Sequence, residues 1–346
     1  MSLKVGIVGL ANVGKSTLFN ALLKKQQALA ANYPFATIEP NVGIVGVPDD
    51  RLEKLAKVVK TENVIPATVE FVDIAGFVKG ASKGEGLGNK FLAHIREVDL
   101  MCLVLRGFSD KDVVETGSGD PKEDLETLKM ELVLADLTSL ERQNEPKMSA
   151  SKEEKIRWGG VEKLKTGLGD GKMARDVELT DEEKVLTKDL SLLTMKPAIE
   201  VLNVDESQVK EGEGTTVKIC AKMEADLSGF SDKEKKEYLE QLGIKETGLD
   251  KLIRLAYEKL GLLSFLTAGE KEVRAWTTKN GSTAPVAAGV IHTDFEKNFI
   301  KAKVTSFSDF LKFKGWKGVS EAGKLRLEGK EYVMEEGDVV EFMVGK

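Results

Sequence analysis

Short runs of apolar and β-branched residues recur along the chain, and longer stretches with helical spacing of apolar residues separate them. The runs are KVGIVG at 4–9, TVEFVDIAG at 68–76, LMCLVLR at 100–106, KPAIEVLN at 196–203 and TTVKICA at 215–221. This alternation predicts an α/β fold in which a parallel sheet carries helices on both faces. Ligands of such sheets bind at the carboxyl ends of the strands.

Between residues 121 and 195 the pattern changes to charged amphipathic helices. The first is marked by apolar residues at helical spacing, namely Leu125, Leu128, Leu132 and Ala135. Two further helices are predicted in SKEEKIRWGGVEKLKTGL and LTDEEKVLTKDLSLLTMK, and the second begins at a capping box of Thr180 and Glu183. The glycines of 166–172 predict a flexible tip or a break. We expect an antiparallel helical hairpin inserted into the α/β domain, with most of its charges on a solvated face.

From about residue 264 the chain turns to short strands, which predicts a small β-rich module over 264–346. One stretch of it combines lysines with aromatic residues. The lysines are Lys297, Lys301, Lys303, Lys312, Lys314 and Lys317, and the aromatic residues are Phe299, Phe307, Phe310, Phe313 and Trp316. Lysines for phosphates and aromatic rings for stacked bases are typical of an RNA-binding surface. Equally, the rings can be core residues and the lysines can border a sheet edge.

The segment GLANVGKST follows the first predicted strand and matches the phosphate-binding loop, Gly9-x-x-x-x-Gly14-Lys15-Ser16. Its glycines let backbone N–H groups point at phosphate oxygens, and a helix predicted near 15–25 adds its positive N-terminus. Lys15 is expected to reach the β and γ phosphates, and the Ser16 hydroxyl to bind Mg²⁺. The nucleotide-binding residues expected here are Gly9, Asn12, Val13, Gly14, Lys15, Ser16 and Thr17.

Two downstream segments supply the remaining parts of a nucleotide hydrolase. Thr37 lies in a Pro-flanked loop, which could close on the metal. Asp73 ends a predicted strand and would bind Mg²⁺ through water, while the Gly76 N–H would reach the γ-phosphate. Phe77 stands where small GTPases commonly have a water-orienting glutamine, so we expect slow turnover. The glycine-rich residues 76–91 are interpreted as a long mobile switch.

The base-reading motif departs from the guanine-specific pattern N-K-x-D. The strand ending at 203 is followed by Asn203-Val204-Asp205-Glu206, so that valine replaces the lysine and glutamate replaces the aspartate. A glutamate is one methylene too long for the same bidentate pair of hydrogen bonds to guanine, and the loss of such a set removes most discrimination. We therefore expect Asn203, Val204 and Glu206 to contact the base without strict selection of GTP.

Composition and charge limit the remaining possibilities. The chain has 346 residues, a net charge of −6 and only two cysteines, Cys102 and Cys220. Each cysteine falls in a predicted buried strand, where packing is favoured over a redox role, and so few cysteines suit a reducing cytoplasm. No apolar run approaches the length of a membrane span, and no signal peptide is recognised. The net charge favours no global binding of nucleic acid, so we expect neither a membrane nor DNA as a partner.

These motifs together resemble the YchF/Obg-like ATPase family of P-loop GTPase-like proteins. The resemblance rests on GLANVGKSTLFNAL, NYPFATIEPNVGIV, VDIAGFVKGASKGEGLGNKFL, NVDE and the tail from AGEKEVRAW onward, and it covers nearly the whole chain. It implies a Ras-like nucleotide domain over 1–120 and 196–263, a coiled-coil insert over 121–195 and a C-terminal β-grasp TGS domain over 264–346. It also implies that Val204 contacts adenine and that ATP is hydrolysed better than GTP.

The resemblance further implies partners and cofactors. We expect Mg²⁺, with K⁺ as a further cation, and association with the ribosome, through either the large subunit or the whole particle. Contact with rRNA would be made by the TGS domain and the helical insert.

Two positions depart from the family's pattern. Ala11 replaces a proline, and Leu103 aligns with a histidine that is implicated in hydrolysis in many members. Leucine cannot orient water. His94 is a candidate substitute, although a partly buried structural histidine is the favoured interpretation. The expected catalytic residues are therefore Lys15, Thr37 and Gly76, with His94 as a weaker candidate.

Three function classes remain open at this stage. The leading one is a slow, ribosome-associated ATPase switch. A small-molecule phosphotransferase uses the same loop, but no acceptor site is visible in the sequence. The third is an RNA-binding protein or ribosome-binding regulator that uses GTP or turns its nucleotide over little, if at all.

Overall fold

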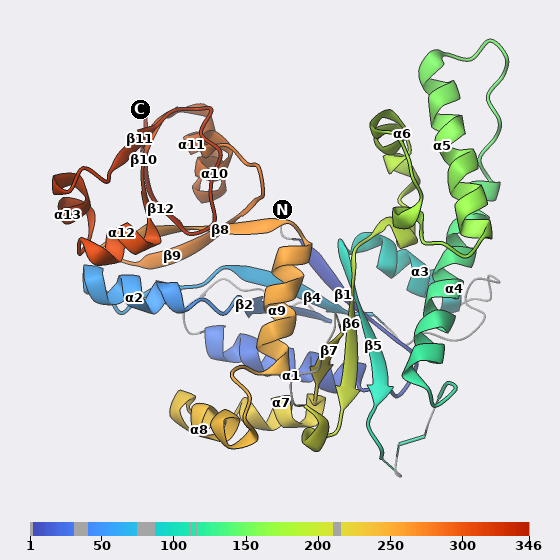
Figure 1. Ribbon diagram of the computed structural model, residues 1–346, viewed down its shortest axis with the longest axis horizontal. Helices are drawn as coiled ribbons and strands as arrows, with labels where there is room; N and C mark the ends of the chain where they lie inside the picture. Colours follow the sequence, from blue (N-terminus) through green and yellow to red (C-terminus); the bar gives the residue numbers. More distant parts are fainter. Residues whose placement is uncertain are drawn as a thin grey trace. The chain divides into compact units, whose positions relative to one another are not determined.

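The computed structural model describes residues 3–30, 41–74, 87–110, 113–114, 116–209 and 216–345. Its contacts divide the chain into two compact units (Figure 1). The first comprises Met1–Leu22, Glu39–Gly43 and Glu70–Leu249, and the second comprises Leu23–Ile38, Ile44–Val69 and Asp250–Lys346. Thr37, Gly76 and Phe77 lie outside the described residues, so the expectations for them stay predictions. The three-domain division also stays a prediction.

One sheet has strand order β2-β4-β1-β5-β6-β7, and apart from residues 44–46 and 68–69 its strands belong to the first unit. The strands are β1 (Lys4–Val8), β2 (Val42–Gly46), β4 (Thr68–Asp73), β5 (Leu100–Gly107), β6 (Ala198–Val204) and β7 (Val217–Ile219). All pairings among β4, β1, β5, β6 and β7 are parallel, which confirms the five predicted strands and their direction. The edge strand β2 was not predicted, because its residues were assigned to the Pro-flanked loop.

Burial explains why β5 occupies the middle of this sheet. Its residues Leu100–Leu105 are all buried, as a strand covered on both faces requires. Cys102 is fully buried there, and burial raises the pKa of its thiol to about 12, so that it is a packing residue. Cys220 corrects the prediction in part, because it follows β7 and caps the next helix, with Sγ accepting from the Met223 N–H at 3.5 Å.

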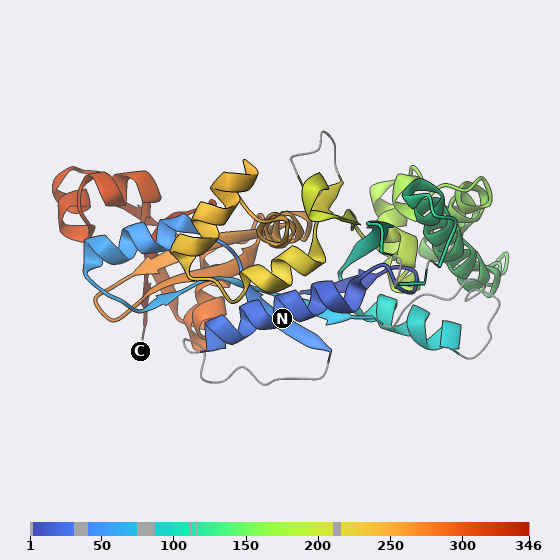
Figure 2. The same ribbon diagram turned by 90° about the horizontal axis from the view of Figure 1, so that it is seen from below.

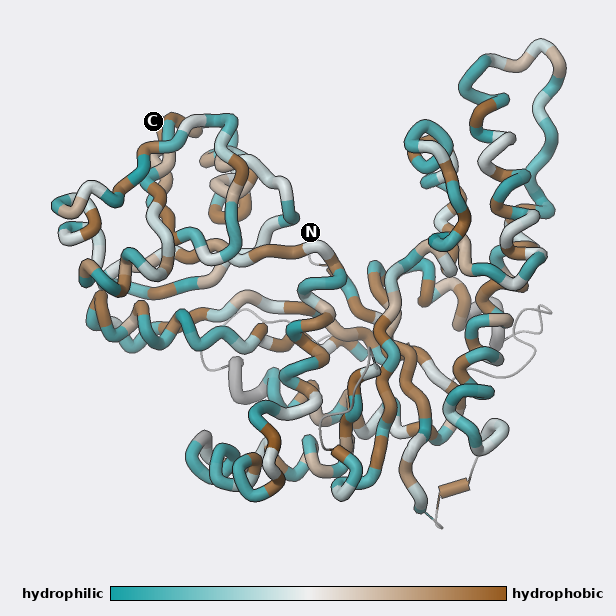
Figure 3. The backbone as a smooth tube through the Cα atoms, viewed as in Figure 1, coloured by the Kyte–Doolittle hydropathy of each residue, from teal (hydrophilic) through white to brown (hydrophobic). Residues whose placement is uncertain are grey.

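Helices accompany these strands. They are α1 (Lys15–Ala30), α3 (Leu87–Glu97), α7 (Ala221–Leu227), α8 (Asp232–Leu242) and the first residues of α9 (Gly248–Lys259). Figure 3 shows the strands of this sheet as largely hydrophobic and α8 as mainly hydrophilic, as expected for an outer helix. The predicted switch over 76–91 needs correction at its end, since residues 87–91 already belong to α3.

The insert contains the predicted helices in shortened form. It comprises α4 (Pro121–Glu141), α5 (Lys152–Gly169), α6 (Asp181–Leu186) and 3-10 turns at Ala174–Asp176, Lys188–Leu190 and Leu193–Met195, gathered together in both views (Figures 1 and 2). Leu125, Leu128, Leu132 and Ala135 are buried as predicted. The capping box of Thr180 and Glu183 is confirmed. The third helix ends at Leu186, earlier than predicted, and a 3-10 turn over Lys188–Leu190 follows it and ends at Ser191 in the left-handed conformation (φ +47°).

The second unit holds a mixed sheet with strand order β11-β10-β12-β8-β9-β3. Its strands are β3 (Val64–Ile65), β8 (Leu262–Ala268), β9 (Val273–Lys279), β10 (Phe299–Ser306), β11 (Arg326–Glu328) and β12 (Asp338–Val344). Its helices are α2 (Asp50–Val59), α10 (Ala284–Ile291), α11 (Thr293–Lys297), α12 (Phe307–Lys312) and α13 (Trp316–Glu321). β12 is parallel to β8, β8 and β9 form an antiparallel hairpin, and α10 covers a core that includes Phe265 and Val304. This is the arrangement expected of a β-grasp module.

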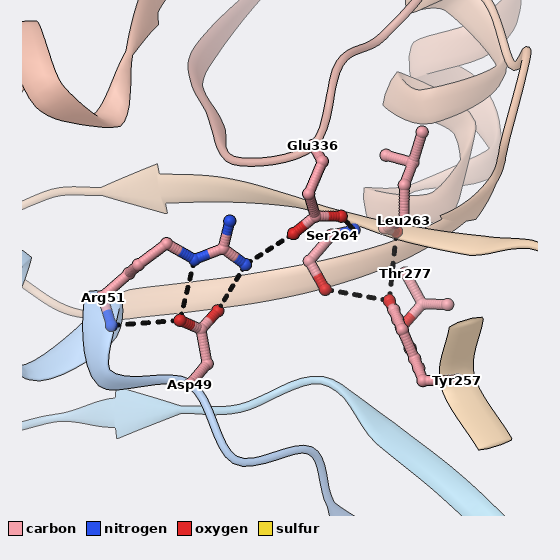
Figure 4. A network of polar contacts seen from close by, with 7 residues as sticks. All are labelled: Asp49, Arg51, Tyr257, Leu263, Ser264, Thr277 and Glu336. Atoms are coloured by element: carbon pink, nitrogen blue, oxygen red, sulfur yellow. Dashed lines mark hydrogen bonds and ion pairs between the residues drawn. The ribbon is translucent and has the colours of Figure 1, made fainter. Parts of the chain in front are cut away.

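Segment 44–69 belongs to this unit through polar contacts as well as through its sheet pairing (Figure 4). Arg51 donates to both carboxylate oxygens of Asp49, at 2.8 and 2.7 Å, and to Glu336 at 2.6 Å. The other oxygen of Glu336 accepts from the Ser264 N–H at 2.7 Å. The Tyr257 hydroxyl donates to the Leu263 carbonyl at 3.0 Å. The bonds of Glu336 join Arg51, early in the chain, to β8 through the turn before β12, and the Tyr257 bond joins α9 to β8.

The lysine-aromatic stretch is only partly a free surface. Phe299 and Phe310 are buried, and Phe310 packs edge to face against Trp316 with centroids 5.2 Å apart, so these rings are core rather than stacking platforms. Lys303 pairs with Glu341 at 3.0 Å, whereas Lys314 is exposed. Also exposed are Lys297, Lys312 and Lys317. None of the helices in the described ranges combines the length and apolar composition of a membrane span.

Candidate nucleotide-binding site

A cavity of about 680 Å³ opens at the carboxyl ends of the parallel strands of the first unit. Its lining residues come from four chain segments: Asn12, Gly14, Lys15, Ser16 and Thr17; Phe108, Ser109, Asp110 and Val113; Asn203, Val204, Asp205 and Glu206; and Cys220, Ala221, Lys222, Met223 and Asp226. The structure thus brings together most of the residues expected to bind the phosphates with those expected to bind the base. Gly9 and Val13 support the loop without lining the cavity.

Two positions of the loop require glycine, because neighbouring atoms lie too close to leave room for a Cβ. A Cβ on Gly9 would lie 2.5 Å from the Val104 carbonyl oxygen. Gly14 has φ +93°, and a Cβ there would lie 2.1 Å from Nδ2 of Asn203. Asn12 also adopts the left-handed region, at φ +59°, which asparagine tolerates better than most residues. The sequence pattern therefore reflects backbone geometry that other side chains would block or strain.

Lys15 and Asp73 form the charged part of the phosphate end. The Lys15 ammonium is buried and donates to the Leu10 carbonyl at 2.5 Å. Burial lowers its pKa, and the nearby Asp73 opposes that change. Asp73 is the last residue of β4, as predicted, and burial raises its pKa while Lys15 acts against the rise. The two side chains therefore lie close enough to influence each other's protonation.

The donor set fits a hard divalent cation. Ser16 is exposed and lines the cavity, and Asp73 offers a carboxylate next to the buried Lys15. Hydroxyl and carboxylate oxygens are the ligands that Mg²⁺ prefers, usually with several waters retained. The third expected ligand, Thr37, lies outside the described residues.

Asn203 lines the cavity and also links two segments of the site. Its side chain is buried, with Nδ2 donating to the Val13 carbonyl at 3.0 Å and Oδ1 accepting from the Ala221 N–H at 3.0 Å. Both functional groups of the amide are therefore engaged within the protein. Asn203 holds the phosphate-binding loop against the start of α7.

The two replaced positions of the base motif differ in exposure. Val204 is only 4% exposed and packs in a cluster with Met223, Leu227 and Leu239. Glu206 is exposed at the start of a 3-10 turn, Glu206–Gln208, and accepts a hydrogen bond from the Tyr238 hydroxyl. Val204 thus offers apolar surface to the cavity, whereas Glu206 offers a carboxylate.

The sequence interpretation missed two walls of the cavity. Arg106 donates to the carbonyls of Asp110 and Val113, each at 3.2 Å, and stacks over Phe108 at 4.5 Å, which shapes the loop after β5. The other missed wall begins at Cys220, directly after β7. The rule that ligands bind at strand carboxyl ends would have pointed to both, because each follows a strand that the pattern predicted.

The structure also shows where His94 and Leu103, the two positions linked to a catalytic histidine, lie. His94 is exposed on α3, so the prediction that it is partly buried is wrong, and it does not line the cavity. Leu103 is 1% exposed within β5, where it packs in the core. Neither residue reaches the cavity.

Comparisons with known proteins agree with this architecture. Residues 4–148 match the family model MMR_HSR1, described as a 50S ribosome-binding GTPase. Residues 262–345 match YchF-GTPase_C, described as a protein of unknown function (DUF933).

Full-length relatives extend the match. The protein from Bacillus subtilis strain 168 named "Ribosome-binding ATPase YchF" is 48% identical, with 99% of each chain covered. The protein of the same name from Escherichia coli O157:H7 is also 48% identical, again over 99% of each chain. The solved structure of the YchF GTPase from Schizosaccharomyces pombe superposes with a TM-score of 0.88 at 36% identity, covering 99% of this chain and 98% of that one. With a phosphate-binding loop, a parallel sheet and a C-terminal module in common with these relatives, the chain belongs to the YchF family.

Proposed function

We propose that this protein is an ATP-binding P-loop NTPase that hydrolyses ATP in preference to GTP, acts as a slow switch and associates with the ribosome. The observation that carries the proposal is that Lys15 and Ser16 share one cavity with Val204 and Glu206. The first pair supports the binding of a triphosphate. The second pair stands where a guanine-reading lysine and aspartate would be.

The base end supports adenine over guanine. Because Val204 lacks the lysine stem that covers guanine, it supplies only an apolar contact to a purine ring. Glu206 supplies an acceptor for an amino group. A purine with an exocyclic amino donor at its 6-position therefore suits this wall better than one with a 6-oxo acceptor.

At the phosphate end, Lys15 is placed to leave the Leu10 carbonyl and pair with phosphate oxygens. Ser16 and Asp73, with Thr37, would hold Mg²⁺, which when bound neutralises charge that develops on the transferred phosphoryl group. Slow turnover is expected, because Phe77 replaces a water-orienting glutamine and neither His94 nor Leu103 lines the cavity.

Ribosome association is supported by the names of the relatives and by the exposed lysines of the C-terminal unit, Lys297, Lys312, Lys314 and Lys317. Lysines on a surface bind the phosphates of rRNA without base specificity. Phe299 and Phe310 are buried and add no stacking surface to this contact. The helical insert, with its charged outer faces, is the second candidate surface. Because ribosomes are cytoplasmic, we expect the protein to act in the cytoplasm.

The alternative is a ribosome-binding or RNA-binding regulator that uses GTP or shows little turnover. Calorimetric titration of ATP, ADP, GTP and GDP, together with phosphate release measured with and without ribosomes, separates the two. We expect ATP to bind at least as tightly as GTP and ribosomes to change the rate of ATP hydrolysis. Tighter binding of GTP by tenfold, about 1.4 kcal/mol, would favour the alternative.

A further inference from the structure

The carboxylate that faces the base end of the cavity is fixed by a residue from another helix. Glu206 lines the cavity and is exposed, so that its three side-chain torsions would otherwise be free. The hydroxyl of Tyr238, on α8, donates to Oε1 of Glu206. Tyr238 does not line the cavity itself. The hydrogen bond therefore orients Glu206 from behind.

Tyr238 is well placed to orient another side chain because its own ring is held. The ring packs against the buried cluster beneath the base end, which includes Val204, Met223 and Leu239. Phe230 meets it edge to face, with ring centroids 5.9 Å apart and an interplanar angle of 86°. The hydrogen bond to Glu206 also raises the pKa of Tyr238, as expected for a hydroxyl that donates to a carboxylate.

The neighbouring carboxylate is engaged elsewhere. Oδ2 of Asp205 accepts from the Ser109 N–H at 3.1 Å, which ties it to the loop after β5. Asn203 is buried with both amide groups in use. Asp205 and Glu206 thus each have one oxygen engaged within the protein, but the bond of Asp205 is to the loop after β5, whereas Glu206 stands where the guanine-reading pattern has its aspartate.

The number of oxygens that the Glu206 carboxylate can offer decides which base it binds better. A freely turning carboxylate can present both oxygens to the two adjacent N–H donors of guanine. Adenine offers its amino group beside a ring nitrogen that is an acceptor, so it needs one accepting oxygen and gains nothing from a second. A carboxylate with one oxygen engaged within the protein matches the adenine requirement.

We propose that Tyr238 is a positioning residue for nucleobase selection, which engages Oε1 of Glu206 and leaves the other oxygen to accept from the amino group of adenine. The proposal rests on the proposed use of ATP. It assigns the preference for ATP to a pair of residues, of which the second lies outside the sequence motif. Tyr238 acts through Glu206 and touches no substrate.

The test compares ATP, GTP and inorganic tripolyphosphate by calorimetric titration of the full-length protein. Tyr238→Phe removes only the hydroxyl, so the ratio of ATP affinity to GTP affinity should fall about tenfold, equivalent to about 1.4 kcal/mol. The affinity for tripolyphosphate should not change, because it has no base. Tyr332→Phe is the matched control: it removes a hydroxyl that donates to the Asp338 carboxylate at 2.8 Å, and Tyr332 does not line the cavity.

A double variant shows whether Tyr238 acts through Glu206. In a Glu206→Ala background, Tyr238→Phe should leave the nucleotide ratio unchanged, since there is no carboxylate to orient. Glu206→Gln tests the same proposal without a change at Tyr238, again through the ratio of ATP affinity to GTP affinity. If the hydroxyl holds the amide oxygen, the NH₂ group faces the base, and the preference should move towards GTP, whose 6-oxo group accepts a hydrogen bond.

The outcomes distinguish the two proposals. Tenfold tighter binding of GTP by the unaltered protein would overturn the ATP assignment and, with it, this one, whereas equal affinities for ATP and GTP would overturn this proposal alone. A clear preference for ATP that persists in Tyr238→Phe, with Glu206→Gln showing no move towards GTP, would overturn the positioning role alone. An equal loss of affinity for all three ligands, together with a lower melting temperature, would show a merely structural tyrosine.

Discussion

The side-chain amide of Asn203 donates to the backbone carbonyl of Val13 across 3.0 Å, and the two residues are 190 positions apart in the chain. The bond joins the base motif at the end of β6 to the phosphate-binding loop after β1. Its partner bond, from the Ala221 N–H to Oδ1, fixes the amide from the other side. Asn203 therefore supports the phosphate-binding loop, and its predicted contact with the base stays a prediction.

Replacing this amide should weaken all nucleotides alike. Asn203→Ala leaves the Val13 carbonyl and the Ala221 N–H without their partners, and each unsatisfied buried group costs about 1–3 kcal/mol. We expect the affinities for ATP and GTP to fall by a similar factor of at least about ten, and the melting temperature to fall. Calorimetric titration and thermal unfolding measure the two effects. A loss confined to one nucleotide would instead show that Asn203 reads the base.

Gly14→Ala should disable the loop by steric conflict. The added Cβ would lie 2.1 Å from Nδ2 of Asn203, and the backbone has φ +93°. Gly171→Ala is the matched control, because Gly171 has φ +82° but no atom within 4 Å of an added Cβ. Both variants incur a backbone strain of about 1–3 kcal/mol, which thermal unfolding would report. Nucleotide binding should be lost only in Gly14→Ala, and equal binding by the two variants would contradict the packing account.

Lys15→Ala removes the buried ammonium of the phosphate end. Hydrogen bonds to charged groups contribute about 1.5–3 kcal/mol, so ATP and GTP should both bind at least about tenfold more weakly and hydrolysis should fall. The ratio between the two nucleotides should stay constant, because Lys15 lies at the phosphate end. Phosphate release over a range of ATP concentrations checks this, and near-normal hydrolysis by the variant would remove Lys15 from the site.

Conversion to guanine recognition is opposed by the burial of Val204. Glu206→Asp together with Val204→Lys reproduces a guanine-reading pair in the sequence and should move the preference towards GTP. However, Val204 is 4% exposed within an apolar cluster, so a lysine there costs stability unless its ammonium reaches the cavity. We expect the double variant to melt at a lower temperature than Glu206→Asp alone. An unchanged melting temperature would show that the cluster accommodates the cation.

Ribosome association should depend on salt and on the exposed lysines. If Lys297, Lys312, Lys314 and Lys317 contact rRNA phosphates, log affinity falls linearly with log salt, and each alanine substitution lowers the slope by about one. Lys303, paired with Glu341, should contribute less. ATP binding should be unaffected, because none of these lysines lines the cavity.

The competing surface is the helical insert. Cosedimentation with ribosomes across a salt series compares the lysine variants with a protein lacking residues 121–195. Full binding with full salt sensitivity after loss of Lys297, Lys301, Lys303, Lys312, Lys314 and Lys317 would place the contact elsewhere.

Features that depend on residues close together in the chain could be predicted from the amino-acid sequence alone. The strand ending at Val8 and the glycines at 9 and 14 lie within one short segment, so backbone requirements alone identify the phosphate-binding loop. Five parallel strands followed from continuous apolar runs, and the capping box at Thr180 followed from residues three positions apart.

Features that depend on residues from distant segments became apparent only in the folded structure. The buried state of Asn203, the engagement of Glu206 by Tyr238 and the exposure of His94 follow from how the segments pack, and no local pattern records it. The same holds for Phe299 and Phe310. As aromatic residues they suited an RNA-binding surface as well as a core, and the packing around the second sheet buries them. A side chain's chemistry is fixed by its type, but its partners are fixed by the fold.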